Sequence, residues 1–371
     1  MTPRRIPFLS LVPGDDAADV RSAIDRVIAR GWFVLGPEVE AFERDFAAAS
    51  GGAHAVGVGT GTDAIALVLR ALGIGAGDEV ITTPLSAAYS ALAVMMAGAR
   101  PVFADIDPVR LTLDPGRIER CVGPRTRAIL PVHLYGQPAD MGAIERIATK
   151  HNLAIVEDCC QAHLATAAGR PVGTIGVAGA FSFYPTKNLG ALGDGGAIVT
   201  SDVTLAALVR RLRNGGQTDR YRHQEAGFNT RLDEMQAAIL RARLPRLRAW
   251  TERRRMLAAR YRERLAGAPV VAVPEVDPGH VYHLFVVRTG AREALQAHLA
   301  ARGIETLIHY PVPIPRQPAL ASMDPAECPL ATRACDEILS LPLHPALRDD
   351  EVDEIATAVH AFEPRTVSSP W

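Results

Sequence analysis

The feature that most constrains the fold is an alternation, between residues 55 and 201, of short apolar runs with helical patterns. Seven runs have strand character: Ala55–Val58, Glu79–Thr83, Pro101–Ala104, Ala128–His133, Leu153–Glu157, Ala178–Phe183 and Ala197–Ser201. Several are apolar without interruption, as expected for strands covered on both faces. Between them, segments such as Thr62–Leu72 repeat apolar residues at helical spacing. The alternation predicts an α/β fold with a mostly parallel sheet and crossover helices.

The chain has 371 residues, which favours one large domain and a smaller one. The sequence pattern changes after Leu232, where a long helical region begins. We expect this helical region to be interrupted near Pro245. A second α/β region follows, with a strand at His283–Arg288, a helix at Arg292–Arg302 and a further strand at Thr306–Tyr310. We predict a large domain over residues 1–245 and a small one over 246–371, with the N-terminal residues packing on the small domain.

Charge and composition favour a cytoplasmic enzyme without nucleic-acid or membrane partners. The net charge is -1, and no apolar run is long enough for a signal peptide or a membrane span. The helical region is rich in arginine, but without interleaved aromatic residues it predicts a solvated helix face and not a nucleic-acid site. These arginines are Arg241, Arg243, Arg246, Arg248, Arg253, Arg254 and Arg255.

The five cysteines predict neither disulfides nor a metal site. Their number is odd, and no C-x-x-C pair occurs. We therefore expect buried, reduced thiols at Cys121, Cys159, Cys160, Cys328 and Cys335.

A glycine-bearing segment, Gly57–Asp63, leads from a predicted strand into a helix whose free backbone amides would suit a phosphate. Its spacing is G-x-G-x-G, whereas the dinucleotide fingerprint is G-x-G-x-x-G, which argues against a nicotinamide dehydrogenase. A plain tight turn explains the segment equally well.

Two residues suggest a specific chemistry. Asp158 closes one predicted strand and Lys187 follows the next, and ligands bind at the carboxyl ends of strands in open parallel sheets. Pyridoxal phosphate (PLP) needs a lysine for its Schiff base and an acid to keep its pyridine nitrogen protonated. On spacing alone, a helix cap or a surface ion pair remains an alternative for both residues.

The sequence resembles the DegT/StrS family of PLP-dependent sugar aminotransferases, a branch of the aspartate aminotransferase fold. The similar segments run in family order across nearly the whole chain, and the run Phe181–Gly196 is highly specific. The others are Gly59–Ala64, Gly77–Ile81, Pro101–Asp107, Val132–Gln137, Glu157–His163, Gly227–Ala237 and His280–Phe285. The resemblance implies the type I PLP-transferase fold, with a mostly parallel seven-stranded sheet and a smaller C-terminal α/β domain.

The resemblance also implies roles. Lys187 would carry PLP and shuttle protons, and Asp158 would pair with the pyridine nitrogen. Gln161 would contact the face that bears the ring hydroxyl. The phosphate would be held by Gly61, Thr62 and Ser182, with Asn229 reaching in from a partner subunit. Alternatively, Thr62 caps its helix, Ser182 faces the core and Asn229 forms a turn. Candidate substrate contacts are Tyr89, Tyr184, His309 and Tyr310.

Two positions depart from the family pattern. Ala87 stands where the family usually has an aromatic residue stacked on the cofactor, and Tyr89 is the nearest ring that could replace it. In addition, Pro315 or Arg316 stands near a position that is often histidine.

The implied reaction moves the amino group of L-glutamate, through the pyridoxamine 5'-phosphate form of the cofactor, to a keto group of a sugar linked to dTDP, UDP or GDP. A homodimer with shared active sites is implied as well. Alternatives are a PLP-binding regulator without turnover and an aminotransferase of amino acids and 2-oxo acids. A sugar dehydratase is disfavoured, because Lys187 is present where such relatives have histidine.

Overall fold

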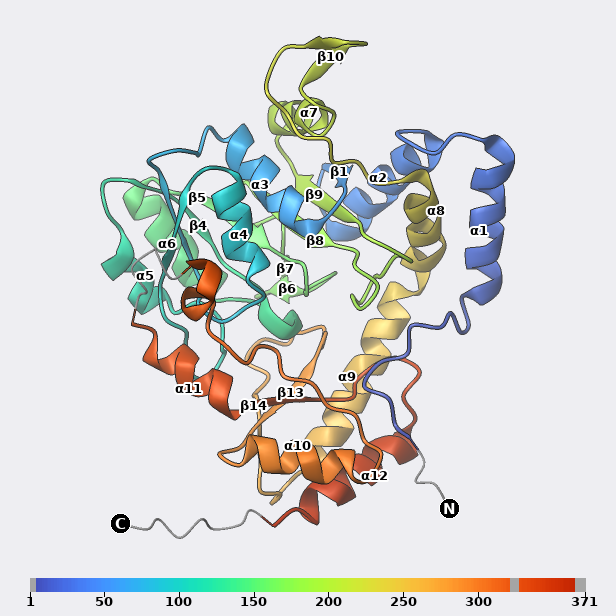
Figure 1. Cartoon of the computed structure of the whole chain (residues 1–371), viewed down its shortest axis with the longest axis vertical. Helices are drawn as coiled ribbons and strands as arrows, with labels where there is room; N and C mark the ends of the chain where they lie inside the picture. The colour runs from blue at the N-terminus through green and yellow to red at the C-terminus, as the bar shows by residue number, and fades with distance from the viewer. Residues whose placement is uncertain (1–4, 321–326, 364–371) are drawn as a thin grey trace.

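The computed structural model describes residues 5–320 and 327–363, and its main sheet has seven strands (Figure 1). Along the sheet they lie in the order β1-β9-β8-β5-β4-β2-β3. Every neighbouring pair is parallel except that β9 runs antiparallel to both β1 and β8. The bounds are β1 (His54–Val58), β2 (Glu79–Thr82), β3 (Arg100–Phe103), β4 (Thr126–Leu130), β5 (Ala154–Asp158), β8 (Ala178–Ser182) and β9 (Gly196–Thr200). The predicted mostly parallel sheet of seven strands is confirmed.

Helices cover both faces of this sheet, because successive strand residues point to opposite sides. Val80 and Val156 pack on one side beneath α3 (Gly61–Ala71), α4 (Tyr89–Met96) and α7 (Val203–Leu212). Ile81 and Ile155 pack on the other beneath α2 (Pro37–Ser50), α5 (Pro115–Cys121), α6 (Met141–His151) and α8 (Glu234–Arg243). Each such side chain stabilises the fold by about 1.5–3 kcal/mol on full burial, so both faces need their helical layer.

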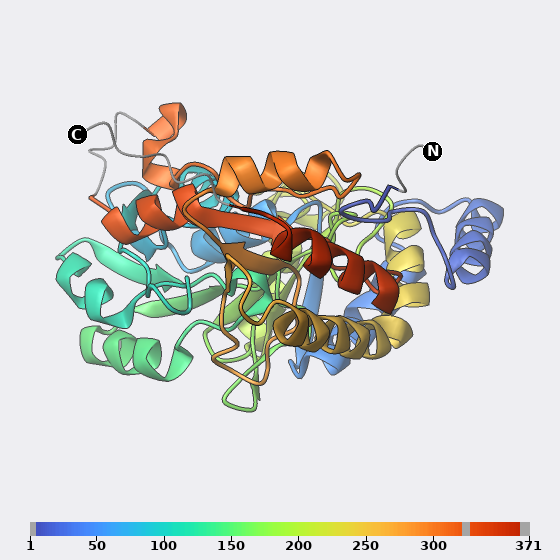
Figure 2. The ribbon, with the colours of Figure 1, turned by 90° about the horizontal axis from the view of Figure 1, so that it is seen from below.

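The C-terminal part has a separate core between an antiparallel sheet and helices (Figures 1 and 2). Its strands lie in the order β12-β13-β14. The core includes Tyr261, Phe285 and Ile355, and Ile6 joins it by bridging to Ile304. The bounds are α9 (Leu247–Arg264), β12 (Val271–Ala272), β13 (Phe285–Arg288), α10 (Arg292–Ala300), α11 (Pro329–Glu337), β14 (Ile338–Leu341) and α12 (Asp349–His360). The proposed domain limits, whose ends include residues outside the described ranges, remain a prediction.

One strand prediction in this part is wrong. Residues Thr306–Tyr310 form no strand beyond a single bridge between Leu307 and Ser340. The third strand is instead β14, which follows directly on α11. Its sequence, Ile338-Leu-Ser-Leu341, is short and buried throughout, so it lacks the alternation that distinguishes a strand from a helix end.

The arginine-rich region forms α8 and α9, joined by a 3-10 turn, η2 (Leu244–Arg246), that contains Pro245. The interruption lies where the sequence predicts it. The prediction that these arginines form a solvated helix face is wrong for Arg243 and Arg254, which are buried. Arg243 Nε donates to Asp16 Oδ2 at 2.6 Å, so the region is held partly by internal polar contacts.

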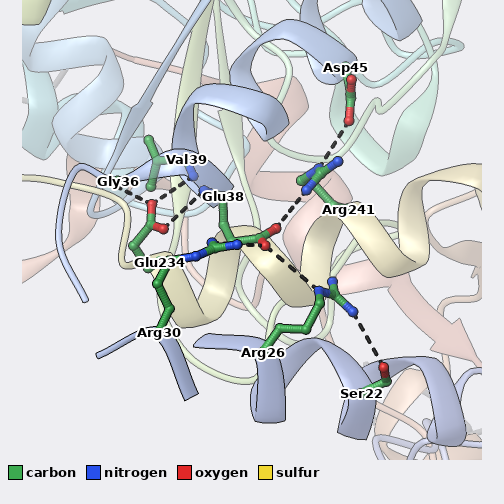
Figure 3. A network of polar contacts seen from close by, with 9 residues as sticks. All are labelled: Ser22, Arg26, Arg30, Gly36, Glu38, Val39, Asp45, Glu234 and Arg241. Carbon is green, nitrogen blue, oxygen red and sulfur yellow. Dashed lines mark hydrogen bonds and ion pairs between the residues drawn. The ribbon is translucent and has the colours of Figure 1, made fainter. Parts of the chain in front are cut away.

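The start of α2 is fixed by a fully buried carboxylate, Glu234, the first residue of α8 (Figure 3). Its two oxygens accept hydrogen bonds from the amides of Gly36, Glu38 and Val39 at 2.8–2.9 Å. A carboxylate at a helix N-terminus satisfies amides that lack intrahelical partners and is favoured by the helix dipole. Glu234 therefore acts as the cap that α2 does not obtain from its own N-cap residue, Gly36.

A second carboxylate, Glu38, connects three helices in the same region (Figure 3). It pairs with Arg26 and Arg30 of α1 (Ala17–Arg30) and with Arg241 of α8. Since Glu38 is buried and has several cationic partners, this network orients α1 and α8 against α2.

The remaining elements are short. Two small hairpins are formed by β6 (Thr166–Ala167) with β7 (Arg170–Pro171), and by β10 (Gln217–Asp219) with β11 (Arg222–His223). The β10 hairpin projects from the molecule beyond α7 (Figure 1). Three 3-10 turns complete the set: η1 (Leu134–Gly136), η3 (Ile314–Arg316) and η4 (Pro318–Leu320).

Across the described ranges, no helix has both the length and the hydropathy that a membrane span requires. All five cysteines are free thiols. Three of them are buried, whereas Cys121 and Cys160 are only partly so, which corrects the expectation of burial for all five.

Candidate active site

Asp158 and Lys187 meet at one edge of the main sheet. Asp158 is the last residue of β5 and is buried, and Lys187 lies in the turn that follows β8. Ser90 Oγ donates to Asp158 Oδ2 at 2.7 Å, and the Cys160 amide donates to Oδ1 at 3.1 Å. The Lys187 amide donates to the Tyr184 carbonyl at 2.8 Å, which closes the turn. The carboxylate is thus held rigidly, and the lysine is presented on a short loop.

The electrostatics of Lys187 suit a nucleophile. Burial lowers the pKa of Lys187, and the nearby Cys160 and Asp158 act in the opposite direction. A lowered pKa increases the fraction of neutral amine, which is the form that attacks carbonyl groups and accepts protons. Burial also raises the pKa of the Cys160 thiol, and the Asp158 charge adds to that effect.

The N-terminus of α3 forms an anion cradle next to this pair. Thr60 caps the helix by accepting from the Asp63 amide at 3.0 Å, which corrects the alternative that Thr62 is the cap. Within the described residues, the amides of Gly61 and Thr62 donate to no protein acceptor, so both are available to an anion. A Cβ at Gly61 would lie 2.5 Å from Cys160 Sγ and 2.9 Å from Ser182 Cβ. Only glycine allows the helix end to approach so closely.

Gln161 and Tyr310 are joined by hydrogen bonds at the same edge. Gln161 Oε1 accepts from the Tyr135 amide at 2.7 Å, and Gln161 Nε2 donates to Tyr310 Oη at 3.0 Å. Burial raises the pKa of Tyr310 far above its usual range, and the charges of Asp158, Cys160 and Tyr89 add to the effect. Tyr310 therefore lies near both Asp158 and Tyr89, in a position to donate its hydroxyl proton to a ligand.

His309 belongs to the same group. Its Nδ1 is 2.9 Å from Ser340 Oγ, its carbonyl accepts from the Tyr135 hydroxyl, and its ring stacks on Phe8 with centroids 5.7 Å apart. Burial lowers the pKa of His309 to about 4, and the Lys187 charge contributes. The imidazole is therefore neutral near pH 7. His309 therefore packs between neighbouring segments and also lies near Lys187.

The other predicted substrate residues lie on the surface. Tyr89 is the first residue of α4 and is 64% exposed, and Tyr184 is 52% exposed. Ala87 lies two residues before the start of α4 and is partly buried. The loop with Pro315 and Arg316 is attached to this region, because the Ile314 amide donates to the Pro84 carbonyl at 2.8 Å.

Asn229 is not brought against Lys187 by any contact within the described chain, and its side chain is exposed. Its neighbour Thr230 is fixed to the α3 end, where Thr230 Oγ1 donates to Asp63 Oδ2 and accepts from the Gly59 amide, both at 2.8 Å. Asn229 itself forms an isolated bridge with Asn214, so it lies exposed at the rim of the anion cradle.

Sequence reasoning missed several residues of the site. Ser90, which orients Asp158, is the second residue of α4 and follows the already noted Tyr89 directly, so it could have been found there. Cys160 follows Asp158 by two residues and is the side chain nearest to Gly61. His163, Asn188 and His283 lie close to Lys187, and no pattern in the sequence distinguishes them from core residues.

A buried cluster of His133, Glu157 and Cys159 has the spacing of a metal site. The ligand atoms of His133 and Glu157 are, however, already engaged in hydrogen bonds. His133 Nδ1 accepts from the Ala139 amide at 3.1 Å, and Nε2 lies 3.1 Å from Glu157 Oε2. The Glu157 oxygens also accept from three loop amides, those of Gly173, Ile175 and Gly176. The cluster is thus a hydrogen-bonded support beneath the loop before β8.

The donor set fits PLP. The site combines a buried carboxylate for a pyridine nitrogen, a lysine with a lowered pKa for an aldehyde, and a glycine-lined helix N-terminus for a phosphate.

Comparisons with known proteins agree with this reading. A family model described as the DegT/DnrJ/EryC1/StrS aminotransferase family matches residues 15–360. The chain is 49% identical over 369 residues to dTDP-3-amino-3,4,6-trideoxy-alpha-D-glucose transaminase of Streptomyces venezuelae, covering 97% of each protein. The crystal structure of S. venezuelae DesV superposes with a TM-score of 0.93 at 49% identity, covering 97% of this chain and 98% of that one. NtdA of Bacillus subtilis with bound cofactor PMP gives a TM-score of 0.89 at 30% identity, covering 96% and 86%.

Proposed function

Since this chain belongs to the DegT/DnrJ/EryC1/StrS aminotransferase family, it is a PLP-dependent aminotransferase, and we propose that it moves the amino group of L-glutamate to a keto group of a nucleotide-linked sugar. The observation that carries the proposal is the meeting of Asp158, Lys187 and the α3 end at one edge of the sheet. The relative from S. venezuelae, a transaminase named for a dTDP-linked amino sugar, supports the substrate class.

When bound, PLP supplies an electron sink for the charge that develops on the substrate carbon. Asp158 would hold the pyridine nitrogen, since a carboxylate raises the pKa of an adjacent nitrogen and keeps it protonated. The Gly61 and Thr62 amides and Ser182 would hold the phosphate. Gln161 and Tyr310 would orient the ring hydroxyl side through their mutual hydrogen bond.

Lys187 would transfer the proton. Burial lowers its pKa, so its neutral amine would accept the proton that leaves the substrate carbon and later donate it again. Because Asp158 and the α3 cradle are fixed by hydrogen bonds to the protein, the short turn that carries Lys187 can position this amine reproducibly.

We expect Asp158→Asn to retain the fold and to slow the glutamate half-reaction by about 100-fold. The amide oxygen can still accept from the Cys160 amide, and the amide nitrogen can donate to Ser90 Oγ, so the local hydrogen bonds survive. What is lost is the negative charge that keeps the pyridine nitrogen protonated. Stopped-flow absorbance with L-glutamate measures the rate, and a rate near that of the unchanged enzyme would assign this role to another group.

The sugar specificity is tested by the second half-reaction. Pyridoxamine-loaded enzyme is mixed with keto sugars linked to dTDP, UDP or GDP, with free keto sugars and with 2-oxo acids. We expect turnover with a nucleotide-linked sugar, because binding of the remote nucleotide positions the reacting carbon. His309→Ala should slow this step about tenfold and leave the glutamate step largely unchanged. Equal efficiency with small 2-oxo acids would make the protein an amino-acid aminotransferase.

We also propose a homodimer in which Asn229 of each subunit reaches the anion cradle of the other. The exposed Asn229 at the cradle rim and the projecting β10 hairpin support this arrangement. Light scattering should give twice the 39.7 kDa chain mass, and Asn229→Ala should weaken cofactor retention about tenfold. An active monomer at the assay concentration is the contrary result.

The proposed location is the cytoplasm, where a reducing environment suits five free thiols. The proposed partners are the two small-molecule substrates and a second copy of the chain.

A further inference from the structure

A cavity of about 600 Å³ opens beside Lys187. Its walls come from the N-terminal segment Leu9–Asp16, the lysine turn Pro185–Asn188, one side of α9 and the loop around His344. This cavity is large enough for a small ligand, and its contact with Lys187 connects it to the site of the chemistry.

Three arginines line the cavity, and they differ in what neutralises them. Arg243 Nε is 2.6 Å from Asp16 Oδ2, and Arg253 Nη1 is 2.8 Å from Asp349 Oδ1. Arg254 has no carboxylate of the described residues within ion-pair distance, although only 4% of it is exposed. Its Nη1 donates to the Leu343 carbonyl at 2.8 Å, while its Nε has no partner in the described chain.

An unpaired buried cation carries a large desolvation cost, which its hydrogen bonds to the Leu343 and Tyr282 carbonyls offset only in part. Burial lowers the pKa of Arg254 to about 10, so the guanidinium remains charged near neutral pH. A buried cation of this kind beside a cavity has the properties of an anion site.

His344 lines the same cavity and is also unsatisfied. It is 6% exposed, and neither Nδ1 nor Nε2 has a hydrogen-bond partner among the described residues. Burial and the Arg254 charge lower the pKa of His344 to about 4, against an opposing effect of Glu351. A neutral imidazole offers one N–H donor, which an acceptor group entering the cavity would satisfy.

We propose that Arg254 and His344 bind a carboxylate of the amino donor and thereby select a dicarboxylic amino acid such as L-glutamate. The proposal rests on the proposed function. A carboxylate matches the fork of a guanidinium and carries the single charge that one unpaired arginine can balance. A nucleotide diphosphate would bring at least two charges to a wall that also contains the exposed Asp15 carboxylate.

Binding of 2-oxoglutarate, a dicarboxylate without an amine, tests this on the purified holoenzyme. Trp250 lines the cavity, so its fluorescence reports occupancy, and calorimetry gives an independent Kd. We expect His344→Phe to raise the Kd for 2-oxoglutarate about tenfold and Arg254→Lys to raise it by at least as much. His344→Phe should leave the melting temperature unchanged, because it removes only nitrogens without protein partners.

Arg253→Gln is the matched control, because Arg253 lines the same cavity but is paired with Asp349. This variant should change the Kd for 2-oxoglutarate by no more than about twofold. UDP, dTDP and inorganic phosphate are titrated in parallel. The proposal is overturned if both variants bind 2-oxoglutarate normally, or if they lose affinity for the nucleotides or phosphate instead. The Kd for 2-oxoglutarate is measured without turnover, so it can be interpreted even if the enzyme aminates no nucleotide-linked sugar. If the variants bind 2-oxoglutarate normally and remain active, only the proposed carboxylate site is refuted, and the proposed function stands.

Discussion

Replacing Lys187 by alanine should lower the rate of the glutamate half-reaction by at least about a thousandfold. The variant loses the group that forms the covalent link to PLP and the base that moves the proton, while the carboxylate and the anion cradle stay intact. PLP should therefore still bind, without the yellow lysine-linked form that L-glutamate bleaches in the unchanged enzyme. Added ethylamine should restore part of the rate, which a misfolded protein would not show.

The composition of the chain makes this assignment unusually easy to verify. The sequence contains two lysines, Lys150 and Lys187. Lys150 is exposed on α6 and pairs with Glu119. Borohydride reduction followed by peptide mass mapping should place the pyridoxyl group on Lys187, and Lys150→Ala should react at the normal rate. Label on Lys150 or on the terminal amine, or a fully active Lys187→Ala, would refute the role of Lys187.

The second large effect concerns stability. Glu234→Ala should lower the free energy of unfolding by about 4 kcal/mol, because three amides at the start of α2 lose a charged acceptor in a buried setting. Glu234→Gln retains the shape and an acceptor oxygen, so its loss should be about half as large. Urea denaturation at one fixed protein concentration measures both, because the proposed dimerisation would make apparent stability depend on concentration.

Glu40→Ala provides the control for this comparison. Glu40 lies in the same first turn of α2 but is exposed, so its removal should change stability by no more than about 0.5 kcal/mol. If Glu234→Ala and Glu40→Ala destabilise equally, the buried carboxylate does not act as the cap of α2.

The sequence predicts those parts of the fold whose signal is local. All seven strands of the main sheet appear within a few residues of their predicted bounds, because each is a distinct apolar run. The proximity of Asp158 and Lys187 could be predicted from the sequence, because the carboxyl ends of parallel strands lie along the same edge of a sheet. The helix cap is Thr60, two residues before the position that the sequence suggested, Thr62. The exact start of a helix depends on backbone angles that composition does not specify.

The remaining features depend on distant contacts. β14 is a strand only because β13 lies beside it, and its four residues carry no period of their own. The hydrogen bonds that hold the buried Arg254 could not be predicted from its own helix, because the carbonyls of Tyr282 and Leu343 that it contacts come from other segments. Glu234 likewise shows no sign in the sequence of its partners almost two hundred residues earlier.

The antiparallel placement of β9 has a consequence for the order in which the protein can assemble. β1, which leads into α3 and its anion cradle, is an edge strand joined to the sheet only through β9. Gly196 at the start of β9 packs directly on Thr60 and Gly61, with no room for a side chain. A chain emerging from the ribosome therefore cannot complete the phosphate cradle until β9 has inserted between β1 and β8. Because closing such a long loop is slow, acquisition of cofactor should be a late event in folding.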